Sequence, residues 1–337
     1  MRLAAILFLA VIGFVGCRSS KAEEPLGTKP AYGEGEDAAA ANTKAKTAPY
    51  VAAAPPEPHR TGPPPARWAM WPMPNFPDSG LPNPESYDVS VAGTVVDRVT
   101  GLMWQRAVEP GNVPFYDAIA RCDRLALGGY QDWRLPSRIE LVSILDLAEI
   151  QPSIDRVAFP GTPSEWFWSS SVAAENAAAA WYVYFYFGYP KADEQRSHFR
   201  VRCVRTEKPP AFTGDPDAHY EVGSTSVHDL ATGLTWQRAL ASGTFGFEAA
   251  LRYCTHLNLE GHKDWRVPSM PELVTLVDER TSNPAIDRSA FPATPADGFW
   301  TSSRFGNKPT DAWHVFFKEG NALYGLLKAP YRVRCVR

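Results

Sequence analysis

Apolar positions along the chain recur with helical and strand periods, in the same order in both halves. From Phe115 to Leu127 the apolar residues recur three and four positions apart. This spacing places Ile119, Cys122 and Leu125 on one face of a helix that we expect to end at Gly128.

Two short strings each open a second helix. Ser137 and Glu140 form a capping box, in which side chain and backbone satisfy each other across one turn, and we expect the helix to continue through Leu147. Ser269 and Glu272 repeat the box, with a proline in the first turn where no backbone donor is lost.

Strand-like stretches lie before and after these helices. A short strand and a Thr-Gly turn are predicted in Val95–Trp104, and a strand that is aromatic on both faces in Trp181–Phe187, whose counterpart is Ala312–Lys318. The last strands are predicted at Phe199–Arg205 and Tyr331–Arg337. Each half is therefore predicted to be α+β, with two helices and an antiparallel sheet.

The two halves are copies of one another at a constant offset of 132 positions. The string Asp-Trp-Arg-x-Pro-Ser-x-x-Glu-Leu begins at Asp132 and again at Asp264. We predict a segment 1–17, a spacer 18–85 and two domains, 86–206 and 207–337. The duplicated tryptophans that mark the fold are Trp104, Trp133, Trp168, Trp236, Trp265 and Trp300.

The duplicated string is interpreted as a structural element. Its Ser and Glu cap a helix, and Trp133 and Trp265 are expected to fill the core between helix and sheet. Asp132 and Arg134 are expected to pair with charged residues elsewhere, such as Arg156 or Asp155. Nothing beside the string supplies a nucleophile or a base.

The N-terminus has the pattern of an export signal. Arg2 precedes an apolar run too short to span a bilayer, and Gly16 precedes Cys17. This ending resembles a bacterial lipoprotein signal, so Cys17 is the predicted lipidation site; the alternative is an ordinary secretory signal with an incidental cysteine. The Ala- and Pro-rich stretch that follows reads as a spacer that lifts the folded part off a membrane. We expect an exported envelope lipoprotein, on the outer membrane or the cell surface.

The other four cysteines predict one disulfide per repeat. Cys122 and Cys203 are 81 positions apart, and so are Cys254 and Cys335. Closing a loop of that size stabilises a fold by about 4.5 kcal/mol in the chain-entropy model. A four-cysteine metal site is the alternative, and it lacks any short Cys-x-x-Cys spacing.

The order of these motifs resembles the Lcl C-terminal domain family, also called DUF1566. The matching stretches are Thr100–Gln105, Asp132–Leu141, Phe167–Ser171 and Val201–Arg205, with a second set 132 residues later. The resemblance implies a fold similar to C-type lectin-like domains and formylglycine-generating enzymes. It also implies glycan binding, because the collagen-like adhesin after which the family is named has a domain associated with sulfated glycans.

Known catalytic motifs are absent from the sequence, and no histidine occurs at the same place in both copies. We therefore expect no catalytic residue, no cofactor and no metal. Formylglycine-generating enzymes hold copper with a pair of thiols, whereas both thiols of each copy belong here to a predicted disulfide. The net charge of −3 and the lack of a polybasic run give no indication of a nucleic-acid partner.

A binding surface remains as the predicted functional feature. The candidate ligand-binding residues lie along the final hairpins: Arg196, Arg200, Arg202, Lys328, Arg332 and Arg334. If the cysteine faces the helix, Arg200 and Arg202 should face away from it; the alternative is that these arginines brace the fold internally. Tyr182, Tyr184, Tyr186 and Tyr189, which are specific to one copy, are further candidates for glycan stacking.

Three functions follow from this pattern. The first is a non-catalytic adhesion or binding protein for a polysaccharide or a surface protein. The second is a structural envelope component that packs against other proteins, and the third is an enzyme related to the formylglycine-generating enzymes.

Overall fold

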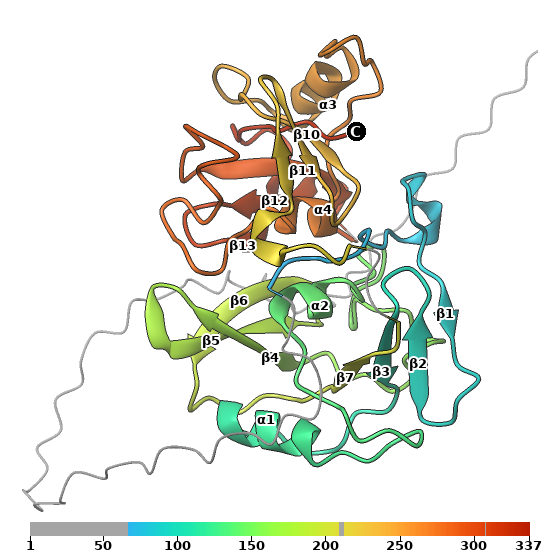
Figure 1. Ribbon diagram of the computed structural model, residues 1–337. Coiled ribbons are helices and arrows are strands. Elements are labelled where there is room, and N and C mark those ends of the chain that lie inside the picture. Colours follow the sequence, from blue (N-terminus) through green and yellow to red (C-terminus); the bar gives the residue numbers. More distant parts are fainter. Residues whose placement is uncertain (1–66, 209–211, 307) are drawn as a thin grey trace, which may run out of the picture. The chain divides into compact units, whose positions relative to one another are not determined.

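The computed structural model describes residues 67–208, 212–306 and 308–337 (Figure 1). The first domain contains η1 (Pro77–Ser79), β1 (Tyr87–Asp88), β2 (Thr94–Asp97), β3 (Leu102–Gln105), α1 (Phe115–Asp123), α2 (Arg138–Val142), β4 (Trp166–Ala173), β5 (Asn176–Tyr184), β6 (Tyr189–Glu194) and β7 (Val204–Thr206). The second contains η2 (Pro216–Ala218), β8 (Tyr220–Val222), β9 (Ser226–Asp229), β10 (Thr235–Gln237), α3 (Phe247–Thr255), α4 (Met270–Val274), β11 (Gly298–Arg304), β12 (Asp311–Phe316) and β13 (Asn321–Leu326). The named strands pair antiparallel, so the α+β prediction is confirmed.

Each domain carries two small sheets where the sequence predicted one. The first domain has the orders β1-β2-β3-β7 and β4-β5-β6, and the second has β10-β9-β8 and β11-β12-β13. The predicted last strand is mostly irregular, because the segment changes partners along its length. Arg200 bridges to β4, whereas Val204 bridges to Arg134 and pairs with β3. Val336 likewise bridges to Trp236 and Arg266.

The helices begin where the sequence predicts and end earlier. α1 ends at Asp123, because the chain tightens into a turn in which the backbone N–H of Leu125 donates to Cys122. α2 ends at Val142 and continues as single turns. Within the described residues no helix is long and apolar enough to cross a membrane.

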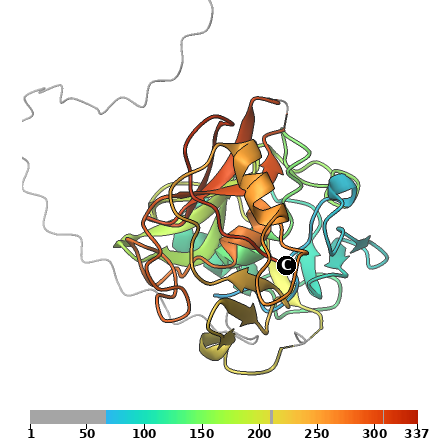
Figure 2. The ribbon, with the colours of Figure 1, turned by 90° about the horizontal axis from the view of Figure 1, so that it is seen from above.

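The predicted disulfides are confirmed, one in each domain. Cys122 is joined to Cys203 and Cys254 to Cys335, with Cα–Cα distances of 5.4 and 5.5 Å. Each bridge ties α1 or α3 to the closing segment of its domain. In Figure 2, which is turned from Figure 1, α3 lies on the outer side of the second domain.

The duplicated string holds the fold, but its charged residues have other partners than the sequence suggested. Arg134 pairs with Glu140 inside the same string, through two bonds of 2.6 and 2.7 Å, and Asp132 pairs with Arg205. Pairing with Arg156 or Asp155 was therefore a wrong prediction: the short helix brings Glu140 back over the start of its own string. The six duplicated tryptophans are all buried, which includes the two predicted to fill the core, Trp133 and Trp265.

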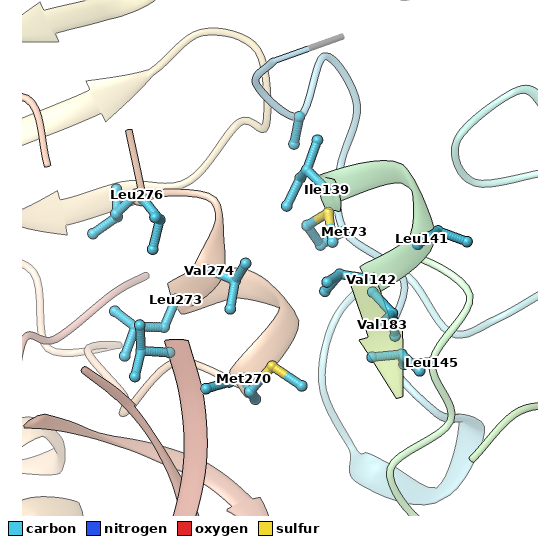
Figure 3. Packing of buried hydrophobic residues seen from close by; sticks show 14 of the residues in the cluster. Met73, Ile139, Leu141, Val142, Leu145, Val183, Met270, Leu273, Val274 and Leu276 are labelled. Carbon is cyan, nitrogen blue, oxygen red and sulfur yellow. The ribbon is translucent and has the colours of Figure 1, made fainter. Parts of the chain in front are cut away.

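The two domains share one hydrophobic core. Figure 3 shows the apolar side chains of α2 and α4 in this shared cluster, with Met73 beside α2. All five residues of each helix are buried, because each helix lies between its own domain and the other one.

Within the described part of the chain, one buried ion pair crosses this joint. The guanidinium of Arg138 donates from Nε to Glu279 at 2.7 Å, and its plane lies 5.0 Å from the ring centre of Trp181. Both charged side chains are almost fully buried. The pair breaks the internal symmetry, because the other copy has Met270 in place of Arg138 and Leu147 in place of Glu279.

The end of the predicted spacer forms part of the folded body. Residues 67–85, called here the N-terminal strap, begin with Trp68, whose indole donates to Asp217 and packs on His219. Met70, Trp71 and Met73 then join the shared core. The prediction that this apolar stretch docks is confirmed. The expectation that it docks on the first domain was incomplete, since Trp68 contacts the second.

We predict that Arg138→Met destabilises the protein by about 3 kcal/mol, because Glu279 is left buried without its partner. Glu279→Leu should destabilise it for the reciprocal reason. The double variant R138M/E279L installs the residues that the other copy has at these positions, and it should recover most of the loss. Urea unfolding of the four proteins measures the coupling; additive losses in the double variant would contradict an interacting pair.

Candidate functional site

One tryptophan stands apart from the others. Ten of the eleven tryptophans are buried, whereas Trp166, at the start of β4, is 39% exposed. Because its ring lies against further aromatic rings, this exposed area is part of a larger apolar surface and is a first indication of a contact site. Trp166 was not singled out by the sequence motifs, although the other copy has Gly298 at this place.

Trp166 begins a row of aromatic rings on one face of the sheet β4-β5-β6. Strand register places Trp166 opposite Tyr184, and Tyr184 opposite Tyr189. The rings of Trp166 and Tyr184 stack with centres 4.9 Å apart and planes at 12°, and Tyr184 stacks on Tyr186 at 5.7 Å and 20°. We call these four residues, Trp166, Tyr184, Tyr186 and Tyr189, the aromatic strip. The three tyrosines are half-buried, while Tyr182, the fourth predicted candidate, is buried in the core.

Two charged residues are linked to the backbone of Trp166: Glu165 precedes it in the chain, and the backbone N–H of Arg200 donates to its carbonyl at 2.8 Å. Arg200 forms a two-point ion pair with Glu165, with distances of 3.0 and 2.8 Å, and Asn112 donates to the same carboxylate at 3.2 Å. The hydrogen bonds from Arg200 lower the pKa of Glu165 and raise that of Arg200. Both groups are therefore charged and held in place, with part of each side chain open to solvent.

Arg202 and Arg334 are not surface residues. Both are fully buried, and each guanidinium donates to two backbone carbonyls at the end of β3 or β10 and to a threonine hydroxyl. Each also lies over a phenylalanine ring, at 4.8 Å for Arg202 and 4.6 Å for Arg334. The expectation that Arg202 faces away from the core was wrong, and the alternative that Arg202 and Arg334 brace the fold internally is what the structure shows. Burial lowers both pKa values to about 9, which still leaves them charged at neutral pH.

The other predicted cations lie at the surface in separate places. Arg196 is exposed and pairs with Glu194, and Lys328 is exposed after β13. Arg332 pairs with Asp297 as its counterpart Arg200 pairs with Glu165. Since this arginine–carboxylate pair occurs in both domains, it is part of the shared scaffold, and only in the first domain does it border aromatic rings of the strip.

The second domain has closed the equivalent surface. Gly298 stands where the first domain has Trp166, and a Cβ added there would lie 2.7 Å from the ring of Tyr331. The rings of Tyr331 and His314 stack at 4.0 Å and occupy the space. Burial lowers the pKa of His314 to about 4, so this ring is neutral at physiological pH. Lys318 and Asn321 replace two of the strip's tyrosines.

The duplication of the domain agrees with a comparison to known families. A sequence model described as the Lcl C-terminal domain matches residues 93–205 and 225–337, which together cover more than half of the chain. The chain belongs to the Lcl C-terminal domain family. No curated protein matches it.

The Lcl C-terminal domain pair also has a hollow outside the strip. This shallow hollow is lined by Gly129–Asp132 and Arg205, but Arg205 already stacks on Tyr130 at 3.7 Å and pairs with Asp132. Among the described residues no group of three or more His, Cys, Asp or Glu side chains could hold a metal ion. The aromatic strip is therefore the candidate functional site.

A carboxylate cluster lies where the strap meets the first domain. Glu85 is close to Asp146, Asp155 and Asp97, and one of its carboxylate oxygens has no hydrogen-bond partner among the described residues. Burial, followed by these three negative charges, raises the pKa of Glu85 to about 8, and burial raises that of Asp97 to about 6. Glu85 is therefore protonated in the folded protein at neutral pH.

This raised pKa predicts that stability falls as the pH increases. The unfolded chain loses the Glu85 proton near pH 4.5, whereas the folded protein keeps it up to about pH 8, so unfolding is favoured progressively across that interval. Glu85→Gln should remove this part of the fall and gain on the order of 2 kcal/mol relative to the wild type between those limits. Urea unfolding at several pH values measures it, and parallel pH profiles for the two proteins would show that the prediction is wrong.

Proposed function

We propose that the protein is a non-catalytic binding protein that recognises a polysaccharide through the aromatic strip of its first domain. The observation that carries the proposal is the exposure of Trp166 in a protein that buries its ten other tryptophans. The stacked rings offer apolar area at a low cost in side-chain entropy, since each has only two rotatable bonds.

The border of the strip supports a sugar as the partner. Sugar rings present C–H faces beside pairs of hydroxyl groups, and those two surfaces suit aromatic rings and fixed, forked polar groups respectively. Here Trp166, whose ring stacks on Tyr184, directly follows Glu165 in the chain, and its carbonyl accepts from the backbone N–H of Arg200, the residue that pairs with Glu165. A protein partner, as in a structural envelope component, is the second candidate, because Trp, Tyr and Arg also dominate protein interfaces.

The fold of each domain supports binding over catalysis. We propose that the Lcl C-terminal domains have a C-type lectin-like fold, in which short helices and small antiparallel sheets are tied by a disulfide between a helix and the closing segment. Formylglycine-generating enzymes hold copper with a pair of thiols, whereas the two cysteines of each domain here are joined in a disulfide. An enzyme of that type is therefore the least supported of the three functions.

We further propose that the protein is an exported lipoprotein anchored through Cys17, displayed at the outer membrane or the cell surface. Cys17 lies outside the described residues, so the proposal depends on the apolar N-terminal run and the Gly-Cys ending. The disulfides of both domains agree with an oxidising compartment.

Affinity electrophoresis tests the proposed function. The protein is run through gels that contain hydroxyethyl cellulose, xylan, pectin, alginate or heparin, and we expect at least one polymer to slow it. Trp166→Ala should abolish most of that retardation, with a loss of affinity of about tenfold or more. Because Trp166 is exposed, the variant should keep the melting temperature of the wild type within a few degrees.

Tyr116→Ala is the matched control, since Tyr116 is an aromatic residue of α1 that is 51% exposed and lies outside the strip. It should migrate like the wild type in every gel. If none of the five polymers slows the wild-type protein, or if the two variants lose retardation equally, the strip is not a polysaccharide site. If the wild-type protein instead retains an envelope protein and Trp166→Ala does not, the result would support the second candidate, a protein partner.

A further inference from the structure

We propose that the binding surface continues from the aromatic strip across the joint onto the second domain, so that it takes a linear polysaccharide long enough to contact both domains. This inference depends on the proposed function and specifies its ligand as a chain rather than a terminal sugar.

Phe187, at the turn between β5 and β6, connects the strip to the second domain. The ring of Phe187 lies 4.4 Å from that of Tyr186 and 6.0 Å from that of Tyr184, so it extends the strip beyond the strands. On its other side it lies 5.6 Å from Phe305 and 5.9 Å from Tyr324, both in the second domain. The row of rings therefore crosses the joint without interruption.

The row of rings ends at Tyr324 on β13. Tyr324 is half-buried and stacks on the buried Phe305, with ring centres 3.8 Å apart and planes at 16°. The ammonium group of the exposed Lys308 lies 5.8 Å from the ring centre of Tyr324. The second domain thus ends the row as the first begins it, with an aromatic ring beside a charged polar group.

Each of these rings is absent from the equivalent position in the other domain. Phe187 corresponds to Glu319, Tyr324 to Ala192, and Phe305 to Ala173. A core requirement within each domain would place large apolar side chains at these positions in both copies, whereas the counterparts are two alanines and a glutamate. The rings that form the row instead come from positions that are not equivalent in the two domains. The row therefore exists only when both domains are assembled.

The fixed joint makes such a surface usable. The two domains share a core and a buried ion pair, so the rings of the second domain stand at a set distance from Trp166. A ligand that reaches Tyr324 therefore gains contacts without ordering the domains first, and its affinity should increase with its length.

The test uses size-fractionated fragments of whichever of the five polymers slows the wild-type protein, with affinity measured by calorimetry. We expect affinity to rise by about tenfold between fragments that cover only the strip and fragments that reach the second domain. Tyr324→Ala, which installs the residue of the other copy, should remove this gain and leave the affinity for short fragments unchanged. Tyr324→Phe keeps the ring and should keep the gain.

Leu323→Ala is the control on the same strand, because Leu323 is an exposed neighbour of Tyr324 whose side chain points to the opposite face. It should not change the dependence on length. Binding that depends on Trp166 but not on fragment length, or that Tyr324→Ala leaves intact for long fragments, would overturn the composite surface and keep the proposed function. Absence of binding to all five polymers would overturn both.

Discussion

A buried carboxylate in each capping box sets the geometry of this protein. Glu140 accepts hydrogen bonds from the backbone of Ser137 and from both terminal nitrogens of Arg134, and Glu272 does the same in the second domain. A five-residue helix has no stability of its own, so these bonds and its packing must hold it. They aim α2 and α4 at one another, and the shared core, the buried ion pair and the docked strap all follow from that orientation.

The elements that depend on local sequence were predictable. Cysteine spacing predicted both disulfides, and the capping boxes predicted where α2 and α4 begin, because each is decided by residues within the repeat. The joint was not predictable in the same way. Arg138 and Glu279 lie 141 positions apart at places that are not equivalent in the two copies, so no repeat pattern pairs them. The strap was likewise recognised as apolar, while its contact with the second domain depends on tertiary packing.

Residues that occur in both copies belong to the shared framework of the two domains rather than to a contact surface. Arg202 and Arg334 were predicted ligand-binding residues and occupy equivalent positions in the two copies. Both are buried, and each donates hydrogen bonds to backbone carbonyls at the end of a neighbouring strand. A residue that two divergent copies keep is one that their common fold requires. The candidate contact surface instead contains positions at which the copies differ, such as Trp166 and Gly298.

The joint also explains how a duplicated protein can have a single surface. Two domains on a flexible linker would each bind separately, and their joint affinity would depend on the effective concentration that the linker allows. Here the cost of fixing the domains is met during folding, by apolar burial between α2 and α4 and by the Arg138–Glu279 pair. In the proposed composite surface, Tyr324 of the second domain lies beside Phe187 of the first, while Tyr331 and His314 occupy the space in the second domain that is equivalent to the start of the strip.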